Sequence, residues 1–318
     1  MAEPSSLLLV GHGSRSAAGV AECRELVETV AGLVPDVTVG CGFLEFAQPD
    51  LDTALDGMVE QGAGEVIAVP LVLLGAGHLK DDGPAALARA RCRHPGAGFR
   101  YGRDLGIHPL VLEVAEERAR TTVAELGRAP SETAVVLVGR GSSDPDANGD
   151  LYKVARLLWD GRGFGTVEPA FVSLAPPGVP DALERCRRLG FTSIAVVPYF
   201  LFTGILVDRI GDQAAEWAAA HPRVDVLVGP HLWPDLRLAR LVLARHEEAL
   251  AGDVRMNCDL CIYRLPLPGH EHKIGRPADG HQHHSRPSHG HQPAGRPAYG
   301  PHRPADDHRH HDDDGERR

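Results

Sequence analysis

Short apolar runs alternate with segments of helical periodicity in the first half of the chain. Residues 6–11 and 37–43 are continuous runs of the kind that forms β-strands. Between these runs, apolar residues recur at three- and four-residue spacing, as on one face of a helix. They are Val20, Cys23, Leu26, Val27 and Val30. This order predicts a strand–helix–strand unit at the start of the chain.

The same alternation continues through the rest of the first half. Asp50 predicts the N-cap of a second helix, whose apolar positions are Leu51, Leu55, Met58 and Val59. Residues 65–71 are almost continuously apolar, as expected of a strand in a parallel sheet covered by helices on both faces. Two further helices are expected near residues 83–93 and 109–126. We therefore predict an α/β half with about four parallel strands.

The second half of the chain repeats the first at a constant offset of 128 residues. The run "GHGS" from Gly11 matches "GRGS" from Gly139, and "FLEFAQP" from Phe43 matches "FVSLAPP". The strand that ends at Pro70 has its counterpart at Pro198. Three collinear matches without a gap predict a duplicated domain, so the fold class is two tandem α/β lobes with parallel sheets. Ligands of open α/β sheets bind beyond the carboxyl ends of the strands, which places the expected site between the lobes.

These observations divide the chain into four parts. We expect a first lobe over residues 1–128 and a second lobe over residues 129–252. Residues 253–268 form a segment with two cysteines, and residues 269–318 form a histidine-rich tail. The tail is rich in Pro, Gly, Arg and Asp and has no apolar face, so it is expected to be disordered.

Charge and composition exclude several classes of function. The formal net charge is −10, and it resides outside the tail, so binding to nucleic acid or to anionic lipid is not expected. The chain shows no basic export signal and no apolar run long enough to cross a membrane. We expect a cytoplasmic protein with reduced cysteines. Four of them fall in predicted helices or strands and are expected in the core: Cys23, Cys41, Cys92 and Cys186.

Three polar residues follow three successive predicted strands. His12 lies in a glycine-flanked turn before Ser14, a candidate helix cap, while Glu45 and His78 follow the second and third strands. Each has an ordinary structural interpretation when taken alone. At the equivalent positions of the second half they become Arg140, Ser173 and Leu206, although the surrounding glycines, prolines and apolar residues persist. Their joint replacement indicates one functional site that only the first lobe retains.

The chemistry of this trio favours a metal ion. Two neutral imidazoles and a carboxylate suit Co²⁺, Ni²⁺, Fe²⁺ or Zn²⁺ and leave coordination positions open. The chain has no GxxxxGK[ST] motif and no GxGxxG after a strand, so the chemistry is expected to proceed without ATP or NAD. His12, Glu45 and His78 are therefore predicted as both metal ligands and catalytic residues.

Two C-terminal features also point to metals. Cys258 and Cys261 form a C-x-x-C pair, whose spacing lets two thiolates share a metal or a cluster, although two cysteines do not complete a four-thiolate site. Its alternative is an incidental pair of surface thiols. Residues 269–318 hold eleven of the eighteen histidines, which suits metal storage or delivery. The alternative for this tail is an inert solubilising coil.

The motifs resemble a known family. "GHGSR", "FLEFAQPDL" and "VPLVLLGAGHLKDD" are similar to those of the class II chelatases, which insert a metal into sirohydrochlorin. "MNCDLC" followed by a histidine-rich tail resembles the long, duplicated sirohydrochlorin cobaltochelatases of cobalamin (vitamin B12) synthesis. The resemblance covers roughly residues 5–250. It implies two flavodoxin-like lobes and an ATP-independent lyase that inserts Co²⁺ into the tetrapyrrole.

The resemblance also assigns roles to residues. It implies that His12, His78 and Glu45 form the metal site, and that Cys258 and Cys261 belong to an iron–sulfur centre, as in some members. Sirohydrochlorin is rich in carboxylates, so cations near the site must offset the acidic body of the protein. The basic residues on or beside the equivalent loops are Arg15, Lys80, Arg140 and Arg209. Arg140 then holds substrate carboxylates in the place where the first lobe holds metal.

Two alternatives remain open on the sequence alone. One is a sirohydrochlorin ferrochelatase or nickelochelatase with the same mechanism, because ligand type does not separate neighbouring first-row metals. The other is a non-enzymatic metal-storage or delivery protein in which the tail carries the function. The expected partners are sirohydrochlorin and divalent metal ions, and the chain is expected to be a monomer or a homodimer.

Overall fold

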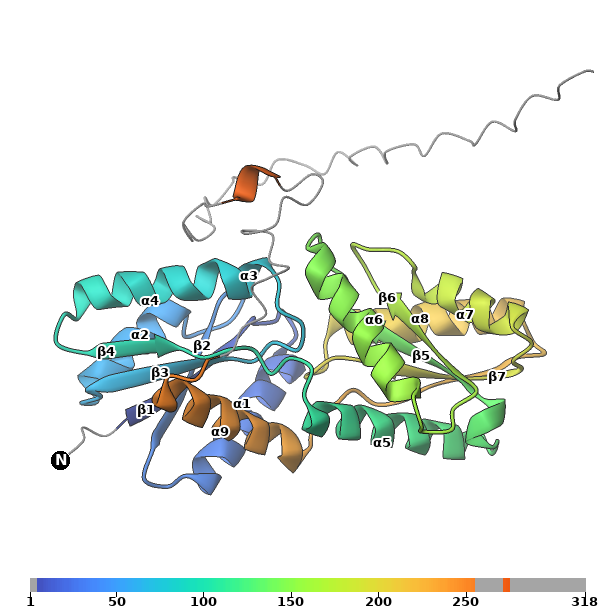
Figure 1. Cartoon of the computed structure of the whole chain (residues 1–318), viewed down its shortest axis with the longest axis horizontal. Helices are drawn as coiled ribbons and strands as arrows, with labels where there is room; N and C mark the ends of the chain where they lie inside the picture. Colours follow the sequence, from blue (N-terminus) through green and yellow to red (C-terminus); the bar gives the residue numbers. More distant parts are fainter. Residues whose placement is uncertain (1–4, 255–270, 275–318) are drawn as a thin grey trace, which may run out of the picture. The chain divides into compact units, whose positions relative to one another are not determined.

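The computed structural model describes residues 5–254 and 271–274, except for the side chains of residues 5, 78, 79 and 273. The first half of the chain contains four strands and five helices among the described residues (Figure 1). In chain order they are β1 (Ser5–Gly11), α1 (Ala17–Leu33), β2 (Thr38–Phe43), α2 (Leu51–Glu60), β3 (Glu65–Pro70), α3 (Gly77–Lys80), α4 (Asp82–Arg93), β4 (Gly98–Tyr101) and α5 (Pro109–Glu125).

The second half repeats this order after a short 3₁₀ turn, except that a single helix takes the place of α3 and α4. Its elements are η1 (Pro130–Glu132), β5 (Ala134–Gly139), α6 (Pro145–Trp159), β6 (Thr166–Phe171), α7 (Val179–Arg188), β7 (Ser193–Pro198), α8 (Ile205–Ala220), β8 (Asp225–Val228) and α9 (Leu236–Ala251). A further turn, η2 (Glu271–Lys273), lies in the C-terminal part.

The strands form two parallel sheets of four strands each, which confirms the predicted fold class. The strand orders are β2-β1-β3-β4 and β6-β5-β7-β8, so the two sheets share one topology. Their registers also agree, because Gly11 pairs with Phe43 in the first sheet and Gly139 pairs with Phe171 in the second. The first strand of each half lies at the centre of its sheet, and its carboxyl end is flanked by the ends of the two neighbouring strands.

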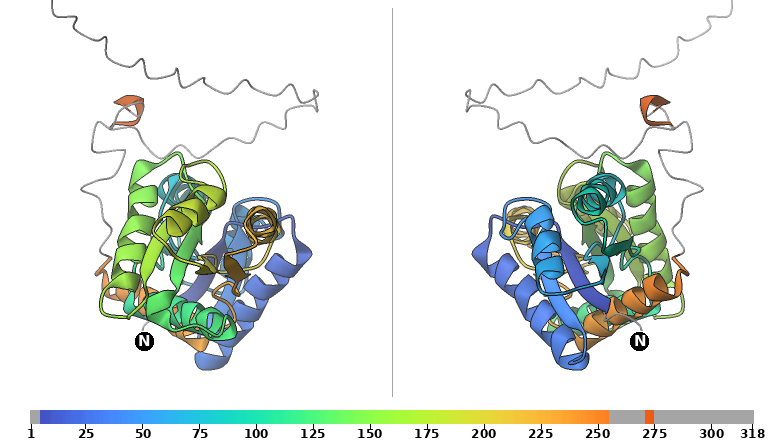
Figure 2. Two further views of the ribbon diagram at one scale, coloured as in Figure 1. Left: turned by 90° about the vertical axis from the view of Figure 1, so that its right-hand side faces the viewer. Right: turned by 90° about the vertical axis from the view of Figure 1, so that its left-hand side faces the viewer.

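Helices cover both faces of each sheet, as the continuous apolar strands require (Figure 2). Alternate residues of β1 face opposite sides: Leu8 packs toward α2 and α4, whereas Leu7 and Leu9 belong to a larger core. This larger core is continuous through both lobes. It contains residues of α1, α5, α6 and α9 and the inner faces of both sheets.

The two lobes exchange their last helices. α5 comes from the first half of the sequence but packs against β7 of the second sheet. α9 comes from the second half but packs against β3 of the first sheet and lies beside α1 (Figure 1). The boundary predicted at residue 128 marks the sequence repeat, whereas each packed lobe contains a helix from the other half.

A buried or half-buried arginine anchors each exchanged helix. Arg245 of α9 donates to the carbonyl oxygens of Asp104 and Leu105, at 2.9 and 2.7 Å. Arg118 of α5 donates to the carbonyl oxygens of His231 and Leu232, at 3.0 and 2.8 Å. The two arginines occupy equivalent places, because each one binds the loop that follows the last strand of the opposite half.

Some sequence expectations fall outside the described residues or are wrong. Cys258, Cys261 and the histidine-rich tail beyond residue 274 lie outside them, as does the side chain of His78. Ser16 caps α1 through Gly19, whereas Ser14 accepts a hydrogen bond from the backbone of Ser16 instead. Cys92 is exposed, because it lies on the solvent side of α4 rather than in the core. Among the described residues, no helix combines the length and hydropathy of a membrane span.

Candidate functional site

The loops after β1 and β2 are joined by main-chain hydrogen bonds. Leu44 donates to the carbonyl oxygen of Gly11 at 3.0 Å, and Glu45 donates to that of His12 at 2.9 Å. Gly13 has a φ of +90°, and a Cβ atom there would lie 1.7 Å from the carbonyl oxygen of Glu45. Only glycine fits this position, and its absent side chain lets the backbones of His12 and Glu45 come together.

The second lobe contains the same loop geometry with different side chains. Ser173 donates its backbone N–H to the carbonyl oxygen of Arg140 at 3.1 Å. Gly141 has a φ of +85°, and a Cβ atom there would lie 1.9 Å from the carbonyl oxygen of Ser173. The repeat inferred from the sequence therefore holds in the backbone at the positions of His12 and Glu45.

His78 is the second residue of α3, the short helix that follows β3. Because β3 pairs with β1, this helix begins at the same edge of the sheet as the His12 loop. The side chain of His78 lies outside the described part of the structure. Among the described side chains, no three of His, Cys, Asp and Glu are grouped as a metal site. The trio is therefore a prediction supported by the strand order and by the joined backbones of His12 and Glu45.

Arg140 contacts the residue that it replaces in the repeat. Its Nη1 lies 3.1 Å from Nε2 of His12. Guanidinium groups only donate, so Nε2 accepts this hydrogen bond and the imidazole carries its proton on Nδ1. Nε2 has one lone pair in this tautomer, so it cannot bind a metal and accept from Arg140 at once. A metal ion bound at Nε2 would therefore compete with Arg140 for this atom.

Each loop turns at a bulky residue with a positive φ. Ala47 donates its N–H to the carbonyl oxygen of Glu45 at 2.8 Å, which closes a γ-turn around Phe46 at φ +60°. The equivalent turn surrounds Leu174 at φ +64°. A γ-turn with positive φ is the rare, strained form. Such a backbone costs on the order of 1–3 kcal/mol and persists only where its surroundings enforce it.

The side chains at these two turns are exposed. Phe46 is 56% exposed and Leu174 is 70% exposed. The Phe46 ring is nearly parallel to the His12 ring, with an interplanar angle of 14° and centroids 6.4 Å apart. Neither residue was predicted from the sequence to belong to the site. The available signal was the apolar residue that both halves place after Glu45 or its counterpart Ser173.

The four expected substrate-binding cations have different surroundings. Arg15 is exposed and lies over the Phe46 ring, 4.8 Å from its centroid, and Arg209 is exposed on α8. Lys80 is different, because its ammonium group lies 2.7 Å from Asp144 and 3.3 Å from Asp146 of the second half. A substrate carboxylate would have to compete with both aspartates for Lys80. Lys80 thus has partners within the chain that were not predicted from the sequence.

A second group of charges surrounds Asp104, in the loop after β4. The pKa of the Asp104 carboxyl is raised to about 6, chiefly by burial and also by the nearby Asp150 carboxylate. Arg103, Arg245 and Lys80 oppose this shift. Asp104 lies where α9 of the second half contacts the first half, and its carboxyl changes protonation within the pH range in which enzymes are commonly assayed.

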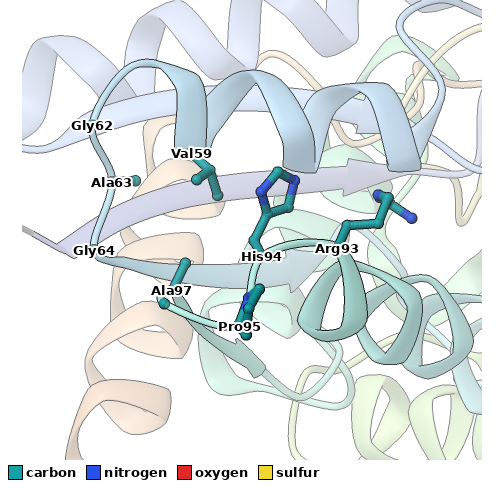
Figure 3. Close-up of a pocket in the computed structure, with 9 residues that line it drawn as sticks. Val59, Gly62, Ala63, Gly64, Arg93, His94, Pro95 and Ala97 are labelled. Atoms are coloured by element: carbon teal, nitrogen blue, oxygen red, sulfur yellow. The ribbon is translucent and has the colours of Figure 1, made fainter.

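A surface pocket of about 610 Å³ lies elsewhere, at the amino ends of β3 and β4 (Figure 3). Its basic residues are already paired with α2: His94 lies 2.7 Å from Asp56, and Arg93 lies 2.9 Å from Asp52. The pocket is at the sheet edge opposite His12, so it is separate from the predicted metal site.

Comparison with known proteins assigns the chain to a family. Residues 6–122 and 134–249 each match CbiX. The chain belongs to the CbiX family. Both CbiX matches coincide with the lobes of the sequence repeat, and the match to the second begins at β5.

The relatives of this CbiX chain are named for the same tetrapyrrole and for two metals. It is 38% identical over 266 residues to a sirohydrochlorin cobaltochelatase of Priestia megaterium, covering 83% of this chain and 86% of that one. It is 32% identical over 219 residues to a sirohydrochlorin ferrochelatase of Bacillus subtilis, covering 69% and 82%. A structure of SirB from Bacillus subtilis with Fe³⁺ superposes with a TM-score of 0.69 at 30% identity, covering 80% and 100%.

Proposed function

We propose that this chain is a sirohydrochlorin cobaltochelatase, which inserts Co²⁺ into sirohydrochlorin without ATP for cobalamin synthesis. The observation that carries the proposal is that both lobes contain the same hydrogen-bonded pair of loops, with different side chains at the equivalent positions. The backbones of His12 and Glu45 are hydrogen-bonded in the first lobe, and Arg140 and Ser173 take their places in the second. Membership of CbiX supports the substrate class, and the cobaltochelatase relative is the more similar of the two relatives compared.

His12, His78 and Glu45 are the residues that would bind the incoming cation. Two neutral imidazoles and one carboxylate hold a divalent first-row metal while leaving positions for the ring nitrogens of the substrate. The ligands come from loops and a short helix at the strand ends. They are therefore fixed by the sheet but contribute little to its core. This arrangement holds the cation without enclosing it.

Insertion exchanges one divalent cation for two pyrrole N–H protons. Two N–H bonds break, metal–nitrogen bonds form, and the two protons leave to bases or to water. Glu45 is half-buried beside the His12 backbone and is the carboxylate placed to accept a proton. The protons must leave the site because the product ring holds the metal in their place.

Arg140 links metal binding to substrate binding. A metal that takes Nε2 of His12 displaces the guanidinium from its 3.1 Å contact. The released cation is then available for a substrate carboxylate, with which it forms a charge-assisted hydrogen bond. Arg15 and Arg209 offer further exposed cations for the substrate edge. Lys80 contributes mainly through Asp144 and Asp146, by joining α3 to the second half.

The decisive experiment is insertion by the purified chain. Co²⁺, Fe²⁺ and Ni²⁺ are each added to sirohydrochlorin and protein, and the absorption spectrum of the tetrapyrrole is followed. The proposal requires protein-dependent insertion that is fastest with Co²⁺. Faster insertion of Fe²⁺ or Ni²⁺ would assign the chain to the ferrochelatase or nickelochelatase alternative. Metal binding without any insertion would favour the storage protein.

The same assay tests the metal ligands. His12→Ala and His78→Ala are expected to slow insertion at least about a hundredfold, since each removes one metal ligand. His94→Ala is the matched control, because His94 lies at the opposite edge of the sheet. Wild-type turnover by His12→Ala would refute the ligand assignment.

We also propose that Cys258 and Cys261 ligate an iron–sulfur centre, and this part stands on the sequence alone. Two of the described cysteines, Cys23 and Cys186, are buried, and burial raises the pKa of each thiol to about 12, which disfavours them as thiolate ligands. A four-iron centre would need other ligands or a second chain. Colourless, iron-free protein after anaerobic reconstitution would contradict the proposal. A cytoplasmic location and a monomer or homodimer likewise remain predictions.

A further inference from the structure

We propose that Phe46 and Leu174 are paired apolar contacts for the macrocycle of the substrate, one at each turn beside the metal site. The inference rests on the proposed function, because it takes the substrate to be a tetrapyrrole with carboxylates at its edge. It assigns a binding role to two residues that neither hold metal nor carry charge.

The backbone at these positions indicates a requirement for a side chain. Phe46 and Leu174 have φ of +60° and +64°, where bulky residues are strained. Glycine would form the same turn without strain. Both turns nevertheless present a large apolar side chain that is more than half exposed. Packing does not account for a residue that is strained and also left in solvent.

The repeat adds a second, independent argument. Between the two lobes His12 becomes Arg140 and Glu45 becomes Ser173, so the chemistry of the loops has changed. The residue at the apex of the turn remains large and apolar in both lobes. Whatever the apex contacts is therefore needed on both sides, unlike the metal ligands.

Both turns adjoin the predicted metal site. The Phe46 ring lies 6.4 Å from the His12 ring, centroid to centroid, and nearly parallel to it. Leu174 follows Ser173, whose Oγ and N–H both donate to the carbonyl oxygen of Arg140 at 3.1 Å. Arg140 in turn contacts His12. A macrocycle with its metal at His12 would extend toward Phe46, and the contact between Arg140 and His12 brings the loop of Leu174 to the same site.

An arginine accompanies each apolar residue. Arg15 lies 4.8 Å from the centroid of the Phe46 ring. In the second lobe the backbone of Arg140 is hydrogen-bonded to Ser173, the residue before Leu174, and its guanidinium extends to His12. A tetrapyrrole has flat apolar faces and, in sirohydrochlorin, carboxylates around the edge. An apolar contact next to a cation matches both parts of such a ligand.

Paired substitutions separate the side chain from the backbone. Phe46→Ala removes the ring but keeps the strain, whereas Phe46→Gly removes both, and Leu174→Ala and Leu174→Gly do the same in the second lobe. We expect each of the four variants to raise KM for sirohydrochlorin about fivefold to tenfold, with kcat changed less than about twofold, because the contact is made equally in ground and transition states. Each glycine variant should melt at a higher temperature than its alanine counterpart.

The control and the direct measurement exclude a purely structural role. Leu189→Ala removes a leucine at the end of α7 whose exposure, 62%, lies between the 56% of Phe46 and the 70% of Leu174, and its KM should equal that of the wild type. Equilibrium binding of sirohydrochlorin without metal should weaken by the same factor as KM rises. An unchanged KM in the Phe46 and Leu174 variants, with active wild type, would overturn this inference alone. A KM that follows melting temperature, higher in alanine than in glycine variants, would also overturn it. Inactive wild type that does not bind sirohydrochlorin would instead overturn the proposed function.

Discussion

His12 shows how far single residues could be predicted. The sequence identified His12, Glu45 and Arg140 because the repeat supplied an internal comparison at each position. It did not predict that Arg140 would contact His12, because the offset relates the two positions without placing them in space. The partners of Lys80 were missed for the same reason: Asp144 and Asp146 belong to the other half of the chain.

The competition between metal and Arg140 for His12 predicts opposite effects on two ligands. Arg140→Ala should raise KM for sirohydrochlorin more than it lowers kcat, because a carboxylate contact is lost. It should also tighten Co²⁺ binding by about twofold to tenfold, since one ordinary hydrogen bond no longer has to break. Isothermal titration with Co²⁺ and steady-state kinetics test the two effects. Arg128→Ala, at an exposed surface arginine, is the control. Weaker Co²⁺ binding in Arg140→Ala would contradict the competition.

The raised pKa of the Asp104 carboxyl predicts that the free energy of unfolding depends on pH. Its folded pKa of about 6 exceeds its ordinary value of 3.8, so the folded state holds an extra proton between these limits. The carboxyl contribution to stability therefore falls as pH rises from about 4 to 6. Asp104→Asn cannot ionise and should be more stable than wild type at pH 7.5, by at most about 3 kcal/mol.

Thermal unfolding at pH 4 and pH 7.5 measures this difference. The advantage of Asp104→Asn should be large at pH 7.5 and small at pH 4, where the wild-type carboxyl is protonated in the folded state. Asp36→Asn, in an exposed turn, is expected to show no such change. An advantage that is equal at both pH values would mean that ionisation of Asp104 is not its cause.

The elements were predictable, but the partners of the last two helices were not. Apolar periodicity predicted the helices that became α4 and α5 to within about a residue. This periodicity indicates which face of a helix is apolar. It does not indicate which of two similar sheets that face will cover. Because the halves are repeats, α5 and α9 present similar faces, and only the structure reveals their exchange.

The anchor of an exchanged helix can be tested at Arg245. This side chain is 2% exposed, and it donates to the carbonyl oxygens of Asp104 and Leu105. Arg245→Ala would leave both carbonyls without this donor and is expected to cost about 2–4 kcal/mol of unfolding free energy. Denaturant unfolding measures the loss. Arg240→Ala, on the exposed side of the same helix, should cost less than about 0.5 kcal/mol. Equal losses in the two variants would show that the anchor contributes nothing special.

At the scale of the whole molecule, the sequence predicted two lobes and a tail of separate character. The lobes are confirmed as two sheets of one topology, whereas the tail beyond residue 274 lies outside the described residues. Its proposed role is metal supply, because eleven histidines on a tether raise the local concentration of a scarce cation.

Truncation after Pro268 tests that role. Insertion should be unchanged at saturating Co²⁺ and slower at limiting Co²⁺, since the tether matters only when free metal is scarce. The difference at limiting metal should shrink by about pH 5.5, where imidazoles with a pKa near about 6.5 are mostly protonated. Equal impairment at saturating metal would give the tail a catalytic or folding role. No impairment at any concentration would support the inert coil.

The 3.1 Å contact between His12 and Arg140 joins two equivalent positions of the repeat, so it lies on the local axis of approximate symmetry. Two identical, unlinked halves related by such an axis would place like beside like: histidine against histidine, or arginine against arginine. The arginine pair would bring two positive charges together. Neither pair would place a proposed metal ligand beside a proposed substrate-binding cation. Halves that are encoded separately, as they are within this one chain, can differ at an axial position. Fusion thus permits a division of labour that no symmetric dimer can reach by mutation.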